Sequence, residues 1–272
     1  MGTFCRATLN YASVASTPGP APRDVAILDA RGADLPGWRA CGFELVQHRS
    51  GVDDWDDDDR VAAVHHPEIE DLARAMTGCD HALVSSHLRR GPAQAARHED
   101  LAPITFVHSD FAANYVDLIR RAYANAEGDG PAAALARRGL TAQAVQDAGR
   151  IVILQFWRNL GPARMDFPLA FCDARTLRPD DGLPFLVTDY AGSGIDFHAL
   201  AVVAPDEPDR HTWYAFPELT PDEAVAFRTY DTDLVREGAT FFTPHSAFRD
   251  PEVPVGEPAR SSIELRATCL FA

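Results

Sequence analysis

The chain contains no lysine, and all 25 of its basic residues are arginine. This absence excludes chemistry that needs a lysine side chain, such as Schiff-base formation or a P-loop lysine on phosphate. Basic residues are also outnumbered, because 40 Asp and Glu give a formal net charge of −15. Such a chain lacks the clustered positive charge that must meet a phosphate backbone, so we expect no nucleic-acid partner.

Cysteine is sparse, and long apolar runs are missing. The five cysteines are scattered singly without a CxxC pair, which argues against a disulfide framework or a zinc ribbon. No basic stretch followed by an apolar core opens the chain, and no apolar run reaches about 18 residues, so we expect neither a secretion signal nor a membrane span. The sequence therefore predicts a cytoplasmic protein. A hydrolase is poorly supported, because neither Gly-x-Ser-x-Gly nor His-Glu-x-x-His occurs.

The first part of the chain has little regular pattern. Residues 1–60 are expected to form an irregular strap and loops, with Pro18, Pro20 and Pro22 in a run typical of a surface loop. The acidic run at 53–59 is typical of a solvated turn or the start of a helix. Apolar residues at helical spacing predict helices over 67–76, 111–126 and 131–147.

Strand patterns dominate from residue 150 onward. Short apolar runs separated by Pro, Gly and Asp predict strands at 82–85, 104–107, 151–157, 168–172, 185–188, 199–203, 212–216, 224–230, 240–243 and 262–271. Many short strands after a more helical half indicate a mainly β fold with flanking helices, a double-stranded β-helix (jelly roll, cupin-like). No repeat or linker divides the chain, so we expect one domain over residues 1–272.

A candidate metal motif, His108-Ser109-Asp110, ends an apolar run. Residues two apart on a strand point to the same face, so His108 and Asp110 can bind one metal together. An imidazole and a carboxylate are two members of the 2-His-1-carboxylate triad, which leaves open positions on Fe(II). By itself this dipeptide spacing is common.

The end of the chain strengthens the motif. His245 precedes Arg260-Ser261-Ser262, and in jelly-roll oxygenases that use 2-oxoglutarate the distal histidine precedes an Arg-x-Ser on the final strand. There the arginine and the serine hydroxyl bind the far carboxylate of the co-substrate. From Arg260 to Arg266 charged or polar side chains alternate with apolar ones, which is typical of a strand that lines a polar cavity, or of a solvent-facing strand. We favour His245 as the third ligand, with His211 as the alternative.

At this point the chain resembles a known family, the non-haem iron oxidoreductases that include a cephamycin-methoxylation component, fungal endoperoxide-forming enzymes and gibberellin-desaturase-like hydroxylases. The resemblance covers roughly residues 43–270. Matching segments occur in the same order: VDDWDD (52–57), SHLR (86–89), VHSD (107–110), FWR (156–158), PLAFCDAR (168–175), HTWYAFP (211–217), YDT (230–232), HSAF (245–248) and RSSIELR (260–266).

This resemblance implies a function as well as a fold. It implies a double-stranded β-helix that uses Fe(II), 2-oxoglutarate and O2 to oxidise an unactivated C–H bond of a small secondary metabolite or modified amino acid. Chlorination is disfavoured, because Asp110 fills the coordination position that halogenating relatives leave empty. Two alternatives stay open: an iron oxidase that needs no 2-oxoglutarate, and a non-catalytic jelly-roll binding protein. The sequence leaves open the substrate, the oligomeric state, and the choice among hydroxylation, desaturation and cyclisation.

Three further arginines are candidates for substrate binding. Arg89 could hold a substrate carboxylate or pair with the acidic surface. Arg158, after an apolar strand, could be an inward-pointing anion clamp, and Trp157 beside it is expected in the core. Arg266 shares the polar face of the last strand and could make the pocket locally basic.

Overall fold

The computed structural model describes residues 2–13, 20–125, 129–207, 209–254, 256 and 258–272. The described residues form two β-sheets, an eight-stranded sheet in the order β1-β2-β10-β7-β12-β5-β9-β8 and a five-stranded sheet in the order β3-β11-β6-β13-β4. The strands are β1 (Thr3–Ala12), β2 (Pro20–Asp29), β3 (Phe43–Gln47), β4 (His81–Arg90), β5 (His108–Ser109), β6 (Arg150–Asn159), β7 (Leu169–Cys172), β8 (Gly182–Val187), β9 (Phe197–Val202), β10 (Trp213–Ala215), β11 (Glu223–Asp231), β12 (His245–Ala247) and β13 (Ser262–Phe271).

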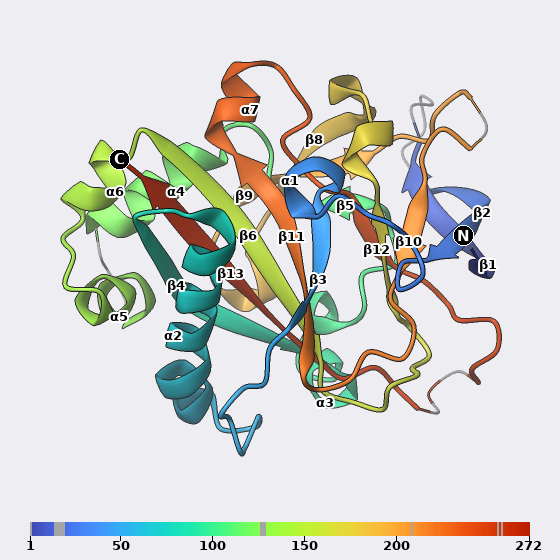
Figure 1. Ribbon diagram of the computed structural model, residues 1–272, viewed down its shortest axis with the longest axis horizontal. Helices are drawn as coiled ribbons and strands as arrows, with labels where there is room; N and C mark the ends of the chain where they lie inside the picture. Colours follow the sequence, from blue (N-terminus) through green and yellow to red (C-terminus); the bar gives the residue numbers. More distant parts are fainter. Residues whose placement is uncertain (1, 14–19, 126–128, 208, 255, 257) are drawn as a thin grey trace.

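Helices gather mainly at one end of the molecule. In Figure 1, α2, α4, α5 and α6 lie together beside β4, while β1 and β2 lie at the opposite end. The α-helices are α1 (Trp38–Cys41), α2 (Asp58–Thr77), α3 (Pro92–Ala95), α4 (Tyr115–Asn125), α5 (Asp129–Arg137), α6 (Gln143–Asp147) and α7 (Thr232–Arg236). Short 3-10 helices are η1 (Glu99–Leu101), η2 (Ala174–Thr176), η3 (Pro179–Asp181) and η4 (Tyr190–Gly192).

The eight-stranded sheet curls around a core of its own. Isolated bridges join Asn10 to Phe106 and Ala12 to Val203, so β1 meets residues from the other half of the same sheet. Leu9, Trp213 and Phe242 are among the buried residues of this core. The curling orients the other face of the sheet toward the five-stranded sheet.

Aromatic residues fill the space between the two sheets. The ring of Phe171 on β7 lies 5.5 Å from that of Phe43 on β3 and 5.0 Å from that of Phe227 on β11, measured between centroids. These residues share one buried cluster that joins both sheets. Two packed, mainly antiparallel sheets with helices at one side match the expected jelly roll with flanking helices.

Helix α2 follows directly from the acidic run. The side chain of Asp57 caps the helix by accepting a hydrogen bond from the backbone N–H of Arg60, and Asp58 and Asp59 occupy the first turn. Carboxylates are favourable there because the N-terminus of a helix carries partial positive charge. The acidic run therefore leads into the start of a helix, which was one of the two structures expected for it. The helix is longer than the predicted 67–76, because it begins before Pro67.

The expectation that residues 1–60 are irregular is wrong. β1, β2, α1, β3 and the first turn of α2 lie there. Pro20 and Pro22 belong to β2, in the half that pairs with β1 alone, because β10 pairs only with residues 27–29. Proline fits such a half-paired strand, since its missing N–H faces no partner strand. Pro18 lies outside the described residues.

Other expected elements have shifted boundaries. Residues 240–243 form no strand and instead lead into β12, and β5 begins at His108, after residues 104–107. The predicted helix over 131–147 is divided into α5 and α6. The predicted strands at 151–157, 168–172 and 262–271 are confirmed as β6, β7 and β13.

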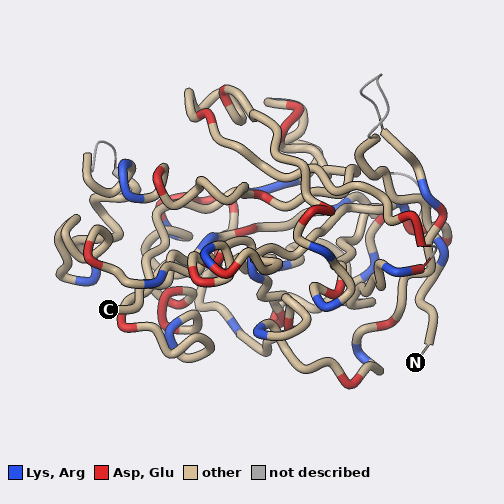
Figure 2. Tube along the Cα trace, turned by 90° about the horizontal axis from the view of Figure 1, so that it is seen from above, with Lys and Arg blue, Asp and Glu red and all other residues tan. Residues whose placement is uncertain are grey.

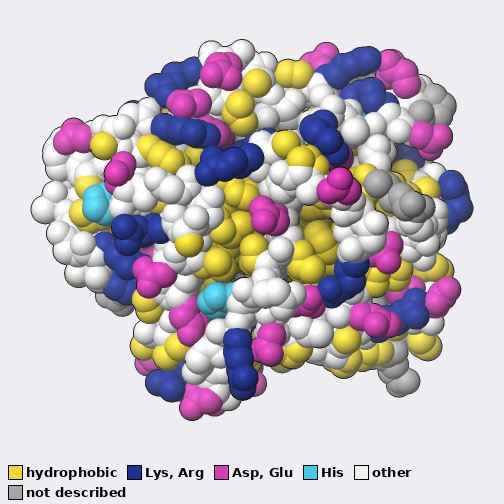
Figure 3. Space-filling model, viewed as in Figure 1, with side chains coloured by type: hydrophobic (Ala, Val, Ile, Leu, Met, Phe, Trp, Pro, Cys, Tyr) yellow, Lys and Arg dark blue, Asp and Glu magenta, His cyan; other side chains and the backbone are white. Residues whose placement is uncertain are grey.

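Charges of both signs are mixed along the chain. Figure 2 shows basic segments lying beside acidic ones across the molecule, and Figure 3 shows apolar side chains gathered at the middle of one face with Arg, Asp and Glu around them. Among the described helices, none combines the length and the apolar character that crossing a membrane requires.

Candidate metal centre

Two histidines meet on neighbouring strands. His108 on β5 and His245 on β12 are directly opposite each other in an antiparallel pair, and their ring centroids lie 4.4 Å apart. Asp110 follows β5, and its Oδ1 lies 3.7 Å from Nε2 of His108 and 3.6 Å from Nε2 of His245. All three side chains are buried, and one candidate ligand atom from each lies within 4.8 Å of the others. The HxD motif and the later His245 are thus brought together, as the sequence predicted.

Backbone carbonyls orient both imidazoles. Nδ1 of His108 lies 2.9 Å from the carbonyl oxygen of Phe106, and Nδ1 of His245 lies 3.1 Å from that of Thr243. A carbonyl oxygen only accepts, so each Nδ1 carries the proton and donates it. The lone pair of each ring is then on Nε2, the atom that faces Asp110, which is the tautomer a metal ligand needs.

The charge state of the cluster suits a cation. Burial, and then the neighbouring His245, lower the pKa of His108 to about 3, so the ring is neutral at physiological pH. Burial opposes ionisation of Asp110, but the guanidinium of Arg266 outweighs it and holds the pKa of this carboxyl well below its usual range. Two imidazoles and a carboxylate are the donor set of the facial triad.

Arg266 on β13 reaches the cluster from the opposite sheet. Its Nη2 and Nε donate to Oδ2 of Asp110 at 2.9 and 3.1 Å. The second oxygen of the carboxylate is thereby held, and Oδ1 is left facing the histidines. The candidate site therefore lies between the two sheets.

A chain of buried polar contacts continues from Arg266. Glu264 lies 3.5 Å from Nη2 of Arg266 and accepts a hydrogen bond from Nη2 of Arg90 at 3.1 Å. The same nitrogen of Arg90 donates to the hydroxyl oxygen of Tyr190 in η4 at 2.7 Å. Sequence reasoning missed Arg90 and Tyr190. Arg90 stands next to the chosen Arg89, and the alternation of β4 could have indicated that the two face opposite sides.

Arg260 and Ser262 lie near the start of β13. Nε of Arg260 donates to Oγ of Ser262 at 3.1 Å. The arginine is only 4% exposed, and its Nη1 has no hydrogen-bond partner among the residues that the structure describes. Burial lowers the pKa of this guanidinium to about 9. A buried guanidinium with an unpaired N–H group can still donate a hydrogen bond to an anion.

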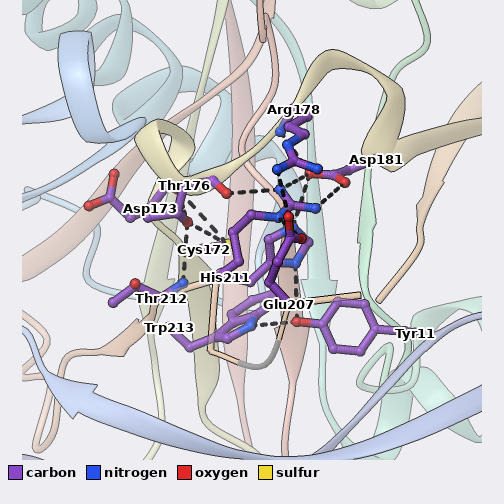
Figure 4. A network of polar contacts seen from close by, with 11 residues as sticks. Tyr11, Cys172, Asp173, Thr176, Arg178, Asp181, Glu207, His211, Thr212 and Trp213 are labelled. Atoms are coloured by element: carbon purple, nitrogen blue, oxygen red, sulfur yellow. Dashed lines mark hydrogen bonds and ion pairs between the residues drawn. The ribbon is translucent and has the colours of Figure 1, made fainter. Parts of the chain in front are cut away.

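The alternative third ligand, His211, lies elsewhere. Figure 4 shows it in a separate polar network, where its Nε2 lies 3.0 Å from Oδ2 of Asp181 and its Nδ1 3.3 Å from the hydroxyl oxygen of Tyr11. Arg210 donates to both oxygens of the same Asp181 at 2.7 Å. The structure groups His245 rather than His211 with His108 and Asp110.

Arg89 and Arg158 were candidates for substrate binding together with Arg266, but they lie on another face of the sheet than Arg266. Arg89 on β4 and Arg158 on β6 are both directly opposite Ile263 of β13. Successive residues of a strand face opposite sides, so Ile263 points away from the face of Ser262 and Glu264. Residues opposite each other share a face, so Arg89 and Arg158 point to the same side as Ile263. Arg89 forms ion pairs with Asp56 and Asp58 near the start of α2. Arg158 donates to the carbonyl oxygen of His48 at 2.9 Å and to its Nδ1 at 2.6 Å.

A second group with similar composition lies on that other face. One candidate ligand atom each from His48, His65 and Glu68 lies within 4.8 Å of the others. His65 is buried, and its Nδ1 lies 3.0 Å from Oε2 of Glu68 and 3.1 Å from Oγ of Ser50. Arg158 contacts this group through His48.

With this geometry established, comparisons with known proteins identify the family. A family profile described as an oxidoreductase/YMDC permease-like domain matches residues 7–270. The hydroxylase/desaturase efuI of Hormonema carpetanum is 30% identical over 245 residues, which cover 83% of this chain and 75% of the relative. The chain belongs to this oxidoreductase family. The resemblance read from the sequence segments is confirmed.

Other similar proteins carry more specific names. The alpha-ketoglutarate-dependent dioxygenase phiK of a fungal species is 25% identical over 236 residues, covering 85% of this chain and 78% of the relative. A solved structure, that of the iron and alpha-ketoglutarate-dependent endoperoxidase NvfI, superposes with a TM-score of 0.76 at 21% identity, over 99% of this chain and 99% of that one. This likeness confirms the jelly-roll fold.

Proposed function

We propose that this oxidoreductase is a non-haem Fe(II)- and 2-oxoglutarate-dependent oxygenase that oxidises a C–H bond of a small secondary-metabolite or modified amino-acid substrate. Its relatives efuI and phiK, a hydroxylase/desaturase and an alpha-ketoglutarate-dependent dioxygenase, support this function. The observation that carries it is the buried cluster of His108, Asp110 and His245, with both Nε2 atoms directed at one carboxylate oxygen. We also propose that residues 1–272 form one oxygenase domain.

Fe(II) fits the donor set on chemical grounds. His108 and His245 donate through Nδ1 to backbone carbonyls and direct Nε2 to the site, and Asp110 supplies one negative charge through Oδ1. Three ligands on one side leave the remaining coordination positions open for a chelating co-substrate and O2. Bound iron and 2-oxoglutarate supply the oxidising chemistry, in which O2 uptake is coupled to decarboxylation of the 2-oxo acid and removal of hydrogen from the substrate.

Residues of β13 and of the segment just before it would hold the co-substrate and the ligand set. Arg260 and Ser262 would bind the far carboxylate of 2-oxoglutarate, because Nη1 of Arg260 is buried and has no partner in the described part of the chain. Arg266 would act through Asp110, whose Oδ2 it contacts, and not by binding substrate as its position in the sequence suggested. The buried setting would exclude water from the reacting groups.

The function can be tested without knowing the substrate. Anaerobic protein loaded with Fe(II) and 2-oxoglutarate should develop a weak visible charge-transfer absorption band. Exposure to O2 should then produce succinate, even slowly in the absence of substrate. A protein that takes up one iron but forms neither the band nor succinate would be an iron oxidase that needs no 2-oxoglutarate. A protein that binds no iron would contradict the proposal altogether.

A further inference from the structure

The inner face of β6 points toward the candidate metal centre. β6 is paired with β13 on one side and β11 on the other. Gln155 is directly opposite Arg266, and Trp157 is directly opposite Glu264. Residues opposite each other in an antiparallel pair share a face, so both side chains are on the side from which Arg266 contacts Asp110.

Both residues keep a buried polar atom without a partner. Trp157 is 1% exposed, and neither its Nε1 nor Oε1 of Gln155 forms a hydrogen bond to any residue described by the structure. Trp213 shows the ordinary outcome for a buried indole, because its Nε1 donates to the hydroxyl of Tyr11 at 2.7 Å. Leaving a buried N–H unpaired costs free energy, so such groups in native proteins usually meet water or a ligand.

The indole of Trp157 lies beside a guanidinium that also has one N–H group without a partner in the described part of the chain. The guanidinium carbon of Arg260 lies 5.1 Å from the centroid of the Trp157 ring. Nη1 of Arg260 likewise has no partner among the described residues, and its Nε is already used on Ser262. The two neighbouring side chains thus each keep one buried N–H group without a partner among the described residues.

We propose that Trp157 is a co-substrate-binding residue whose Nε1 donates a hydrogen bond to the far carboxylate of 2-oxoglutarate, beside Arg260 and Ser262. This inference rests on the proposed function. The indole also stacks under the guanidinium of Arg260 and holds it in place. Trp157 was expected to be a core residue, and its ring does belong to an apolar cluster, but its N–H group serves the ligand.

The test is the Trp157→Phe variant, which removes the N–H group and keeps an aromatic ring. Anaerobic Fe(II) protein is titrated with 2-oxoglutarate, and the charge-transfer band gives the Kd. We expect the Kd to rise about tenfold, as for the loss of one hydrogen bond to a charged group. The titration is repeated with pyruvate, a 2-oxo acid without the far carboxylate, and here we expect the same Kd as for the wild type.

Trp213→Phe is the matched control, because it removes a buried indole N–H in the other core. It should leave the Kd for 2-oxoglutarate unchanged. Wild-type affinity for 2-oxoglutarate in Trp157→Phe would overturn the inference while the proposed function stands. An equal loss for pyruvate would also overturn it, since the damage would then be to packing. If the wild type forms no charge-transfer band with 2-oxoglutarate, both the proposed function and this inference are wrong.

Discussion

Two clusters of two histidines and a carboxylate occur in the described part of the chain, and they differ in what surrounds the ligand atoms. His108, Asp110 and His245 lie between the sheets, whereas His48, His65 and Glu68 lie on the other face of the five-stranded sheet. Both have ligand atoms within 4.8 Å of one another. Composition and proximity alone therefore do not separate a metal centre from a structural network.

The hydrogen-bond partner of Nδ1 separates them. In the first cluster, both Nδ1 atoms face backbone carbonyls, which leaves Nε2 free to bind a cation. In the second, Nδ1 of His48 lies 2.6 Å from Nη2 of Arg158. A guanidinium only donates, so this Nδ1 must accept, and the proton of neutral His48 is on Nε2. His48 then has no lone pair left for a metal.

The two clusters also differ in which atom the nearby arginine contacts. Arg266 contacts the oxygen of Asp110 that faces away from the histidines, so it neutralises charge without covering the ligand atom. Arg158 contacts a histidine ring nitrogen itself and carries positive charge into the cluster. The second cluster satisfies its own hydrogen bonds through Ser50 and Glu68. We therefore expect iron at the first cluster and none at the second.

The largest effect should come from removing one imidazole from each cluster. His245→Ala removes a ligand and should weaken Fe(II) binding more than about 100-fold, beyond the effect of losing a supporting residue. His65→Ala should leave iron binding unchanged. The measurement is iron content per chain after anaerobic loading and desalting. His211→Ala is a further control, and retained iron in His245→Ala would refute the assignment of the third ligand.

A smaller effect is expected from the two arginines. Arg266→Gln frees Oδ2 of Asp110 and should weaken Fe(II) binding about 10- to 100-fold, because the carboxylate loses its orienting partner. Arg158→Gln should lower stability but leave the affinity for Fe(II) unchanged. Competition with a chelator of known affinity measures both. Equal affinities in the two variants would show that the arginine at Asp110 does not orient the ligand.

The second cluster should be visible in the pH dependence of stability. Burial lowers the pKa of His65 to about 4, from about 6.5 in the unfolded chain. Between these values the unfolded chain binds more protons, so the free energy of unfolding falls as the pH falls. From pH 7.5 to 5 this histidine should account for about 2 kcal/mol of lost stability.

Urea unfolding at the two pH values measures this loss. His65→Gln keeps hydrogen-bonding capacity but cannot titrate, so its stability should depend less on pH by the same amount. His66, whose pKa is lowered to about 3 mainly by burial, keeps its contribution in both proteins. Parallel pH profiles for the wild type and the variant would show that His65 does not resist protonation.

The proximity of His108 and Asp110 in the candidate metal centre was predictable because it follows a local rule. The spacing of His108 and Asp110 sets them near one face, and the alternation along β13 sets Arg260, Ser262, Glu264 and Arg266 on another. Convergence with His245 depends on the pairing of β5 with β12, which the order of motifs in the family implies but periodicity does not. The strands β6 and β13 were predictable because β6 is long and strongly apolar, and because β13 alternates polar with apolar residues.

The errors arose where pairing decides the outcome. β1 and β2 are mostly exposed or half-buried, so their pattern carries little hydrophobic signal, and they are strands because they pair with each other. Arg158 was a candidate for an inward-pointing clamp because it ends an apolar strand, and for Arg89 a substrate role and a surface ion pair were both left open. The face that a residue occupies depends on the register in which its strand pairs with its neighbours, and a single sequence does not determine this register. A shift of one residue moves every side chain of the strand to the opposite face.

The smallest effect is expected at Arg89, where a pocket role and a surface role make opposite predictions. Its guanidinium lies 3.0 Å from Oδ1 of Asp58, a carboxylate that is 67% exposed, and it also pairs with Asp56, which is 91% exposed. Exposed ion pairs contribute at most about 1 kcal/mol, which is a shift of about 3 °C in Tm for a chain of this size. Arg89→Ala should therefore have a slightly lower Tm than the wild type, and the difference in Tm should shrink in high salt.

The affinity of Arg89→Ala for 2-oxoglutarate is a second measurement. Its Kd should equal that of the wild type, because the side chain is on the face of β4 that carries α2 and not on the face of Arg266. A marked loss of affinity for co-substrate or substrate without loss of stability would show that Arg89 lines the pocket. The end of β4 would then pair with β13 in a different register.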